Sequence, residues 1–228
     1  MDNTIMHPDM MRIDKLFEPG HTIAWDYLSG FEWPWEALPG ISEFISDYGK
    51  ELDPAEFCKH PGNAWIHKTA VVAPSAYIGN NVIIGAGTNV RHCAFIRENA
   101  LVGAGAVIGN STELKNVILF DGVQVPHYNY VGDSVIGYKS HMGAGAITSN
   151  VKSDHSLITV VCGLHRIETG LKKFGTILGD NVEIGCNSVL NPGNVIGPRT
   201  TVYPLSMVRG FVPGGSIYKK QGEIAEKH

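Results

Sequence analysis

The stretch from His127 to Asn150 holds the side chains of this chain that are best suited to chemistry. It begins directly after Pro126, and Tyr130 follows three residues after His127. An imidazole has an ordinary pKa of about 6.5, so much of it is neutral at about pH 7 and can take a proton from a reacting group. The alternative interpretation is a solvated histidine at a corner of the fold. We favour a general base at His127, because it coincides with a break in a six-residue repeat.

Two cations upstream of this stretch are candidates for holding an anionic group. Arg97 and Lys115 each follow an apolar residue, Ile96 and Leu114, at a place where comparable positions mostly hold Gly or Ala. A charge at that place must point away from an apolar core, so the two side chains could clamp a phosphate from successive turns of the fold. The alternative is that both are solvated surface charges.

Two other polar residues of the stretch have weaker cases. Asn150 could contact a ligand, although asparagine is common at turns for structural reasons alone. His141 could also bind a ligand, or it could stack on an adjacent turn of the fold. The sequence leaves both alternatives open.

A repeat of six residues must position these side chains. From Ile66 to Phe120 every sixth residue is apolar, and a second run with the same period extends from Leu178 to Val208. A glycine or another small residue often follows, as expected where the backbone turns sharply. Three such repeats would form one triangular turn with an inward aliphatic residue on each side. The sequence therefore predicts an all-β fold, a single-stranded parallel β-helix of about seven coils over residues 63–212.

The chain ahead of the repeat has a different composition. Residues 1–62 are rich in large aromatic side chains and are interrupted by prolines. This pattern predicts short helices at Trp35–Leu38 and at Ser42–Lys50, with Ser42 as an N-cap residue. We expect this segment to cap the open end of the β-helix, because a terminal coil otherwise exposes an apolar layer and unpaired strand edges.

Two further segments depart from the repeat. Residues 151–172 contain candidate strands at Leu157–Val161 and Leu164–Glu168, which predict a protruding hairpin inserted between coils. Irregular excursions from a regular scaffold often carry function. Residues 213–228 are polar and charged, and they predict a frayed tail or a short exposed helix.

Composition and charge exclude several classes of protein. The 228 residues include 18 basic and 22 acidic side chains, so the net charge of −4 offers no basic field for nucleic acid. No apolar run approaches the roughly 20 residues of a membrane-spanning helix, and the N-terminus lacks a hydrophobic signal core. The four cysteines form no CxxC pair, which favours reduced thiols. We expect a soluble, cytoplasmic protein without a nucleic-acid or membrane partner.

The motifs resemble those of a known family. HYNYVGDSVIG and GAGAITSN, both between His127 and Asn150, resemble the acetyltransferase domain of the bifunctional bacterial enzyme that makes UDP-N-acetylglucosamine. GLKKFGTILGDNVEIGCNSVLNPGNVIG is similar to archaeal sugar-phosphate nucleotidyltransferases, and PWEALPGISEFI is similar to the linker between their two halves. We expect no nucleotidyltransferase half, since no Gly-rich loop with a basic residue follows an N-terminal strand.

The resemblance to hexapeptide acyltransferases implies an assembly and a set of roles. It implies left-handed coils, whereas crossovers between parallel strands are usually right-handed. It also implies a homotrimer with sites in the clefts between neighbouring chains. His127 corresponds to the general base that acts on the amine of a sugar phosphate. The residues that would surround the phosphorylated sugar or nucleotide-sugar are Arg97, Lys115, Tyr130, His141 and Lys173, and those that would bind acetyl-CoA or another acyl-CoA are Ala144, Asn150 and Cys186.

Three positions depart from the family pattern. His141 stands where the family has an asparagine, Val151 where it has a tyrosine, and Cys186 where it has a serine of the coenzyme site. The sugar side is therefore more similar than the coenzyme side. The first hypothesis is coenzyme A-dependent acyl (acetyl) transfer to the amine of a sugar phosphate or nucleotide-sugar similar to glucosamine-1-phosphate. The alternative is a non-catalytic subunit for sugar-phosphate binding or assembly.

We expect no metal site. The γ-class carbonic anhydrases, which share the β-helix, bind zinc through a His-x4-His pair and a third histidine upstream. Here His127, His141 and His155 are spaced by fourteen residues, and no His-x4-His pair exists. Histidines from neighbouring chains could still meet. Acyl transfer to an amine requires neither a metal nor a covalent enzyme intermediate, so no cysteine is assigned as a nucleophile.

Overall fold

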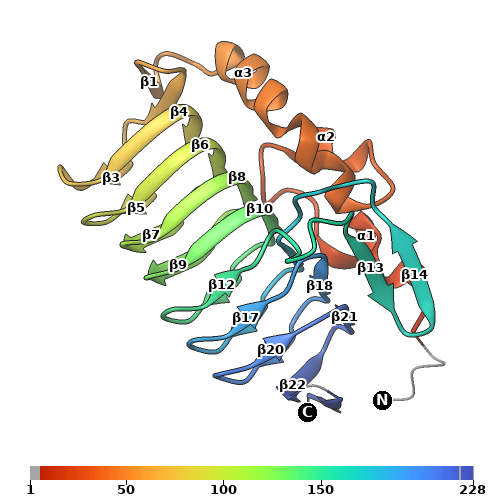
Figure 1. The fold of residues 1–228 in the computed structure, drawn as a ribbon. Coiled ribbons are helices and arrows are strands. Elements are labelled where there is room, and N and C mark those ends of the chain that lie inside the picture. Colours follow the sequence, from red (N-terminus) through yellow and green to blue (C-terminus); the bar gives the residue numbers. More distant parts are fainter. Residues whose placement is uncertain (1–5, 221, 228) are drawn as a thin grey trace.

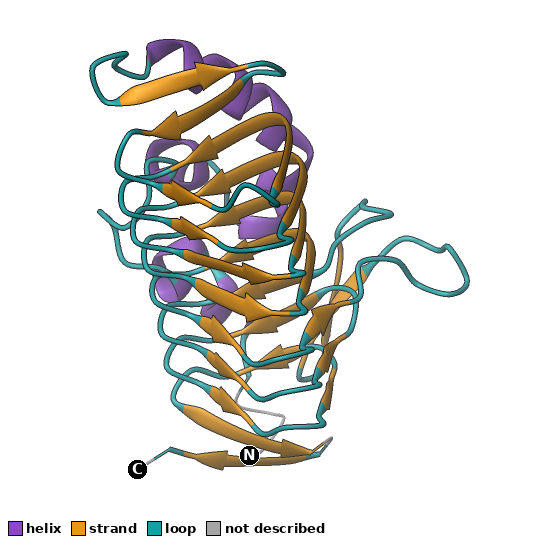
Figure 2. Ribbon diagram, turned by 90° about the vertical axis from the view of Figure 1, so that its left-hand side faces the viewer, coloured by secondary structure: helices purple, strands orange, loops and turns teal. Residues whose placement is uncertain are grey.

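The computed structural model describes residues 6–220 and 222–227 and shows a parallel β-helix with a helical segment along one side (Figure 1 and Figure 2). The strands of the coils form one 12-stranded sheet and one nine-stranded sheet, joined at the corners, and an inserted pair of strands forms a separate two-stranded sheet. The predicted all-β architecture is confirmed. The β-helix has about nine turns, so the prediction of seven coils is too low.

The 12-stranded sheet contains the longest strands of the molecule. Four of them, β4, β6, β8 and β10, are seven or eight residues long and continue round a corner of the coil. The strands of this sheet are β1 Phe57–His60, β2 Ala64–His67, β4 Tyr77–Ile84, β6 Phe95–Val102, β8 Glu113–Leu119, β10 Tyr130–Ile136, β12 Ile147–Thr148, β15 Thr176–Leu178, β17 Val189–Leu190, β18 Asn194–Ile196, β20 Met207–Val208 and β21 Phe211–Val212.

The nine-stranded sheet consists mostly of two-residue strands, one for each turn of the coil. It contains β3 Val71–Val72, β5 Asn89–Val90, β7 Val107–Asn110, β9 Gln124–His127, β11 His141–Met142, β16 Glu183–Ile184, β19 Thr201–Val202, β22 Ser216–Lys220 and β23 Glu223–Glu226. Within the two sheets the pairings are parallel, except β1 with β2 and β22 with β23.

The inward residues of the repeat form the core. Ile84, Val102 and Leu119 pair on successive strands and are at most 1% exposed. The pairing of β6 with β8 contains a register shift, which makes the coil from Val102 to Leu119 one residue shorter than the coil before it. For this reason the sixth-residue pattern points to Phe120 instead of Leu119, although both side chains are buried.

Asparagine and aspartate form one corner of the N-terminal coils, which we call the upper coils; the C-terminal coils are the lower coils. Asn81, Asn99, Asn116 and Asp133 have φ angles of 58°, 53°, 53° and 49°. Short polar side chains tolerate this left-handed conformation and can hydrogen-bond locally. Asn81 Nδ2 donates to Asn99 Oδ1 at 3.0 Å, and Asn116 Nδ2 donates to Asp133 Oδ1 at 3.0 Å. Side chains at this corner therefore connect one coil to the next.

The N-terminal segment is helical, as predicted. Its helices are η1 Pro8–Met11, α1 Ile13–Leu16, α2 Trp25–Ser29, η2 Pro34–Gly40 and α3 Ile41–Glu51. The expected N-cap at Ser42 is wrong, because α3 begins at Ile41 directly after η2. Gly40 has φ −92° and ψ −1°, so the chain enters α3 without the extended backbone that a capping side chain normally requires. No helix in the described ranges is long and apolar enough to cross a membrane.

The helical segment lies along the flank of the β-helix, which differs from the expected position over its open end (Figure 1). The Asp121 and Asp180 amides donate to the carbonyl oxygens of His21 and Leu16, both at 3.0 Å, and Asn116 Nδ2 donates to Leu38 at 3.2 Å. These contacts are spread over several coils. The edge of the first coil is instead covered by β1, which supplies antiparallel backbone partners for β2.

The insertion and the C-terminus each form an antiparallel pair of strands. Strands β13 (Thr159–Cys162) and β14 (His165–Glu168) form the predicted hairpin, which lies outside the coils, next to α1 (Figure 1). The expectation of a frayed tail or a helix after Pro213 is wrong, because β22 continues the coil beside β19 and β23 pairs back onto β22. The backbone groups of the last coil thereby gain partners despite the polar sequence.

Candidate active site

A group of polar side chains surrounds Asp133 on the 12-stranded sheet. Lys115 Nζ lies 3.3 Å from Asp133 Oδ1, and the Nδ2 atoms of Asn116 and Asn150 donate to the two carboxylate oxygens at 3.0 and 2.5 Å. The side chains of Asp133 and Lys115 are only 5% and 17% exposed. Their attraction is therefore less screened than that of a surface ion pair. We call Lys115, Asn116, Tyr130, Asp133 and Asn150 the Asp133 network.

The register of β8 and β10 positions this network. Leu114 pairs with Val131, and both side chains point into the core with 0% exposure. Lys115 comes next and pairs with Gly132, so its side chain points outward. Asp133 follows Gly132 at the corner, where its left-handed conformation brings the carboxylate beside Lys115.

Tyr130 borders the network at the start of β10. Asn150 Nδ2 also lies 3.2 Å from the Tyr130 hydroxyl oxygen and donates to it. Burial and then the charge of Asp133 raise the pKa of Tyr130, so the phenol is protonated at neutral pH. Gly132 leaves the space for this arrangement, because a Cβ atom there would lie 2.5 Å from the Tyr130 hydroxyl. The phenol can therefore donate a hydrogen bond to a ligand oxygen.

Arg97 belongs to an adjoining ion-pair group, on the strand before Lys115. Its guanidinium lies 3.0 Å from Glu113 and 3.8 Å from Glu98. The hydrogen bond to Glu113 is the main cause that raises the pKa of Arg97. Glu113 pairs with Tyr130 in the sheet, so Arg97 and the Asp133 network share one surface. The two cations predicted to hold a phosphate therefore already face carboxylates.

His127 ends β9 at the neighbouring corner, and its side chain is exposed. Its backbone N–H donates to Asn129 Oδ1 at 3.1 Å. Asn129 is 2% exposed, and its Nδ2 donates to the carbonyl oxygens of Gly143 and Ala146 at 2.9 and 3.0 Å. Asn129 therefore fixes the corner from inside, a role that the sequence did not reveal. Within residues 6–220 and 222–227 no hydrogen bond involves the His127 imidazole, so both ring nitrogens are open to a ligand.

Ala144 and Cys186 follow His127 along the same corner. The Gly145 amide donates to the carbonyl oxygen of His127 at 3.0 Å, and the Asn187 amide donates to that of Ala144 at 2.8 Å. Cys186 is exposed and carries a free thiol. The three candidate residues therefore lie on successive coils.

The two remaining candidates lie apart from this corner. Lys173 is exposed and precedes Phe174, whose amide donates to the carbonyl oxygen of Asn150 at 3.0 Å, so Lys173 lies beside the Asp133 network. His141 lies on the nine-stranded sheet, where its Nδ1 is 2.8 Å from Glu183. Within one chain the structure does not bring His141 to the Asp133 network.

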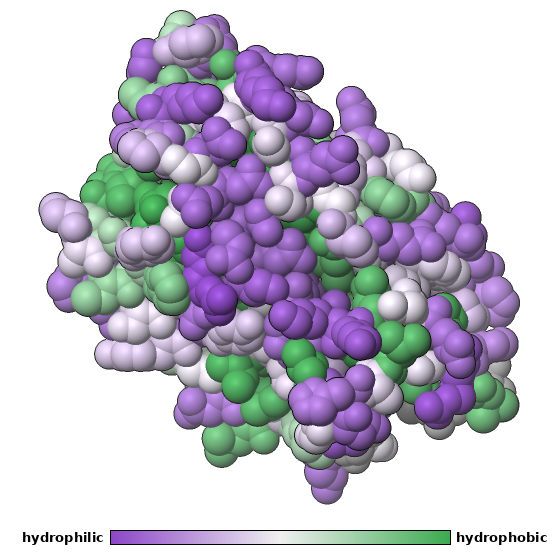
Figure 3. Space-filling view, turned by 45° about the horizontal axis from the view of Figure 1, so that its top comes forward, coloured by the Kyte–Doolittle hydropathy of each residue, from purple (hydrophilic) through white to green (hydrophobic). Residues whose placement is uncertain are grey.

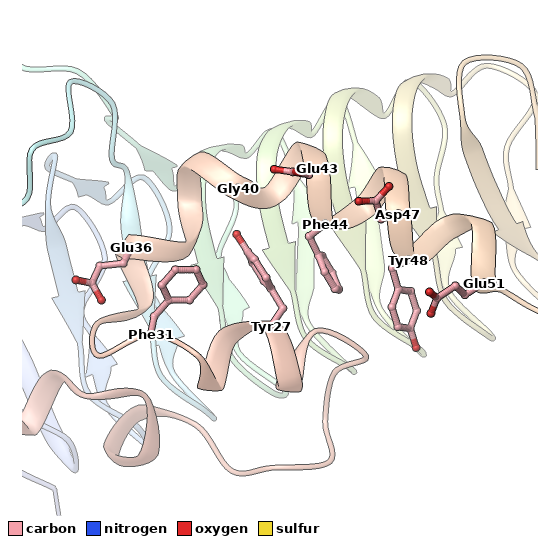
Figure 4. A pocket seen from close by; sticks show the side chains of 9 residues that line it. All are labelled: Tyr27, Phe31, Glu36, Gly40, Glu43, Phe44, Asp47, Tyr48 and Glu51. Carbon is pink, nitrogen blue, oxygen red and sulfur yellow. The ribbon is translucent and has the colours of Figure 1, made fainter.

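Other features of the described part contribute no metal site to this region. Among the residues that the structure places, no three His, Cys, Asp or Glu side chains converge to hold a metal ion. A cavity of about 550 Å³ lies between α2 and α3 and contains none of the candidate residues (Figure 4). Its lining is aromatic and acidic apart from one glycine: Tyr27, Phe31, Glu36, Gly40, Glu43, Phe44, Asp47, Tyr48 and Glu51.

Two family models match the chain. The model of the GMPPB C-terminal domain matches residues 86–209, and the model of the bacterial transferase hexapeptide, with six repeats, matches residues 57–92. The first match includes the Asp133 network and the His127 corner. The hexapeptide resemblance of the sequence is therefore confirmed.

Curated relatives match the same coils. A bifunctional sugar-1-phosphate nucleotidylyltransferase/acetyltransferase of Sulfurisphaera tokodaii is 32% identical over 161 residues, which are 71% of this chain and 40% of the relative. The bifunctional protein GlmU of Methanococcus maripaludis is 29% identical over 217 residues, which are 93% of this chain and 53% of the relative. The chain thus spans about half or less of the length of these relatives.

Solved structures of acetyltransferases also align with the fold. The acetyltransferase domain of PglB from Neisseria gonorrhoeae, in complex with acetyl coenzyme A, aligns with 22% identity and a TM-score of 0.34. The alignment covers 68% of this chain and 53% of that domain. The score is too low to add to the family assignment.

Proposed function

We propose that this chain, which belongs to the family of the GMPPB C-terminal domain, is an acyltransferase of the hexapeptide type. It moves an acetyl or another short acyl group from coenzyme A to the amine of a sugar phosphate or nucleotide-sugar. The observation that supports this most is the position of an exposed histidine, His127, at the corner that leads into Tyr130 and the Asp133 network. Relatives that combine nucleotidylyltransferase and acetyltransferase activities in their names match these coils.

The chemistry requires a group that takes a proton from the amine. The amine attacks the carbonyl carbon of the thioester, and His127 takes the proton that the nitrogen loses. When the tetrahedral intermediate collapses, the carbon–sulfur bond breaks, and the imidazolium gives a proton to the leaving thiolate. The products are an amide and the free thiol of coenzyme A. No step requires a bond to the protein, so Cys186 has no nucleophilic role.

A backbone amide near His127 can stabilise the developing oxyanion. The Ala144 N–H makes no backbone hydrogen bond within the described residues, whereas its neighbour Gly145 donates to the carbonyl oxygen of His127 at 3.0 Å. An unused donor beside the general base suits the charge that forms on the carbonyl oxygen. We therefore assign Ala144 to the acyl-donor side together with Asn150 and Cys186.

The members of the Asp133 network other than Asn150 hold the acceptor, together with neighbouring residues. Tyr130 donates from its protonated phenol, and Lys173 is the exposed cation beside the network. Arg97 is paired with Glu113 and Lys115 with Asp133, so a phosphate must displace these carboxylates before it contacts either cation. The phosphate therefore approaches from the side of Lys173, and Lys115 mainly keeps Asp133 in position.

The complete site forms between chains of a homotrimer that works in the cytoplasm. Figure 3 shows a hydrophilic face that is broken by separate apolar areas. Tyr77 and Phe95 are 60% and 41% exposed with ring centroids 5.4 Å apart, and Tyr128, beside His127, is 65% exposed. Exposed aromatic residues next to both halves of the site support the packing of a neighbouring chain against them.

Thiol release from acetyl-CoA tests this proposal. The purified protein is incubated with acetyl-CoA and, in separate reactions, with glucosamine-1-phosphate, galactosamine-1-phosphate and UDP-linked amino sugars. We expect acceptor-dependent release of thiol with at least one of them, together with an acetylated product in the mass spectrum. Calorimetric binding of a sugar phosphate without binding of acetyl-CoA would instead support the non-catalytic subunit.

A further inference from the structure

A second cavity lies beneath the inserted hairpin and has a different chemical character from the Asp133 network. Its volume is about 470 Å³, which is within the usual size of a small-molecule site. One wall is the β13–β14 hairpin, the opposite wall is formed by residues 191–192 and 209–210 at two corners of the lower coils, and the segment 149–154, which leads into the insertion, lines the remaining side. The lining residues are Ser149, Val151, Lys152, Ser153, Asp154, Thr159, Val161, Arg166, Asn191, Pro192, Arg209 and Gly210.

The hairpin is held closely over these corners. A Cβ atom at Gly210, where φ is 72°, would lie 2.8 Å from the carbonyl oxygen of Val161. A Cβ atom at Gly193 would lie 2.5 Å from a methyl carbon of Ile158. Both contacts join the insertion to the coils on either side of the cavity. The cavity walls are therefore fixed by packing and not only by a surface loop.

The cavity contains three cations and one carboxylate. Lys152 is already used by the loop, since its Nζ donates to Ser156 Oγ at 2.6 Å and to the Leu157 carbonyl at 3.2 Å. The carboxylate of Asp154 accepts from the Ser156 amide and hydroxyl at 3.0 and 2.8 Å. Across the described ranges, 6–220 and 222–227, neither Arg166 nor Arg209 has a carboxylate within 4.0 Å. Two guanidinium groups therefore face the cavity with their donors available.

We propose that this cavity binds a ligand that carries more than one phosphate, with Arg166 and Arg209 as its charged donors. A guanidinium group presents a planar set of donors that matches phosphate oxygens, and two of them from opposite walls suit a diphosphate. The hydroxyl groups of Ser149, Ser153 and Thr159 line the same space and can complete the contacts. The site is distinct from Arg97 and Lys115, whose charges are balanced by carboxylates.

The phosphates can come from two sources. Ser149 and Val151 flank Asn150, so the cavity adjoins the acyl-donor side, and the ligand can be the diphosphate portion of coenzyme A. This source rests on the proposed function. A separate nucleoside diphosphate is the other source, and it does not require acyl transfer. Both use the same two arginines.

Calorimetry on the full chain tests the site with coenzyme A, ADP and inorganic pyrophosphate as probes. The variants are Arg166→Gln, Arg209→Gln and the double change, all at exposed positions. Arg91→Gln is the matched control, because Arg91 is also exposed and lies outside the cavity. We expect each cavity variant to weaken binding of at least one probe by about ten- to a hundredfold, and the control to leave it unchanged.

The outcomes distinguish the site from the enzyme activity. Arginine-dependent binding of coenzyme A alone identifies the acyl donor as the source, whereas arginine-dependent binding of ADP or pyrophosphate identifies a separate phosphate ligand. Either result supports the site even if the wild type shows no acyl transfer. The proposal is overturned if no probe binds, or if the double variant binds every probe as tightly as the wild type.

Discussion

Cations occupy equivalent positions of the repeat in two regions of the molecule, but their partners differ. In the upper coils Arg97 and Lys115 follow inward aliphatic residues and face Glu113 and Asp133. In the lower coils Arg209 follows the inward Val208, and it faces no carboxylate within 4.0 Å in the part of the chain that the structure describes. The position in the repeat determines only that a charge points outward. The neighbours determine whether it stabilises the fold or is available to a ligand.

The energetic consequence follows from burial. Asp133 is almost completely buried and balances Lys115, so removal of one partner leaves the other with an uncompensated charge. Arg209 is exposed, so water solvates its charge when no ligand is bound. Substitutions in the two regions should therefore affect different properties, namely the free energy of unfolding in the upper coils and ligand affinity in the lower coils.

The largest effect on stability is expected for Asp133→Ala. The change removes the acceptor of Lys115, Asn116 and Asn150, and we expect it to lower the free energy of unfolding by about 3 kcal/mol. Urea denaturation of the two proteins measures this difference.

Asn99→Ala provides the control for the backbone at this corner. Asn99 has φ 53° and Asp133 has φ 49°, so both changes place alanine in the left-handed region. Among the described residues the Asn99 side chain accepts only from Asn81, and its replacement should cost about 1 kcal/mol plus the same backbone strain. Equal losses in the two variants would show that the charge of Asp133 contributes nothing.

A smaller effect is expected for Tyr130→Phe. The lost hydrogen bond to Asn150 should cost about 1 kcal/mol at pH 8. Burial and the charge of Asp133 raise the pKa of Tyr130 in the folded state. The stability that this group provides is therefore complete below about pH 10, where the unfolded phenol titrates, and is lost as the pH rises further.

The pH dependence of the stability difference between the wild type and Tyr130→Phe isolates the contribution of Tyr130 from those of the other tyrosines. Phenylalanine cannot ionise, so the difference between the wild type and Tyr130→Phe should narrow as the pH increases from 8 to about 10.5. Free energies of unfolding measured at several pH values test this. A constant difference over that range would contradict the role of burial and of Asp133.

The smallest effect on stability is expected for Arg209→Ala. Arg209 is exposed and has no acidic partner in the described residues, so the free energy of unfolding should change by no more than about 0.5 kcal/mol. The same urea denaturation applies. A loss of about 2 kcal/mol or more would show that Arg209 stabilises the coils, and it would remove the contrast between the two regions.

Much of the scaffold was predictable because the six-residue repeat indicates which side chains are buried. Every sixth apolar residue marks an inward side chain, and the residue after it must point outward, as Lys115 does. The hairpin was predictable from its β-branched strands. The position of the helical segment was not, since its contacts with Asp121 and Asp180 join residues that are far apart in the sequence. The C-terminal strands were missed because their polar sequence pairs through the backbone alone.

Only those residues of the site that match the motifs of the family were predictable from the sequence. Asp133 and Asn129 were not singled out for a role, because nothing in their spacing shows that one accepts from three side chains and the other is buried beneath a corner. The pairing of Arg97 with Glu113 was also invisible, since it depends on the sheet register. The sequence therefore indicated which side chains could do chemistry, but not which charges are already neutralised.

The comparison of the wild type with His127→Ala in the thiol-release assay decides whether this corner is an active site. His60→Ala is the control, because His60 is an exposed histidine on β1, at the edge of the first coil. We expect turnover to fall by about 10²- to 10⁴-fold in His127→Ala, with an unchanged oligomeric state, and to be normal in the control. Wild-type turnover in purified His127→Ala would contradict the assignment of His127 as the general base.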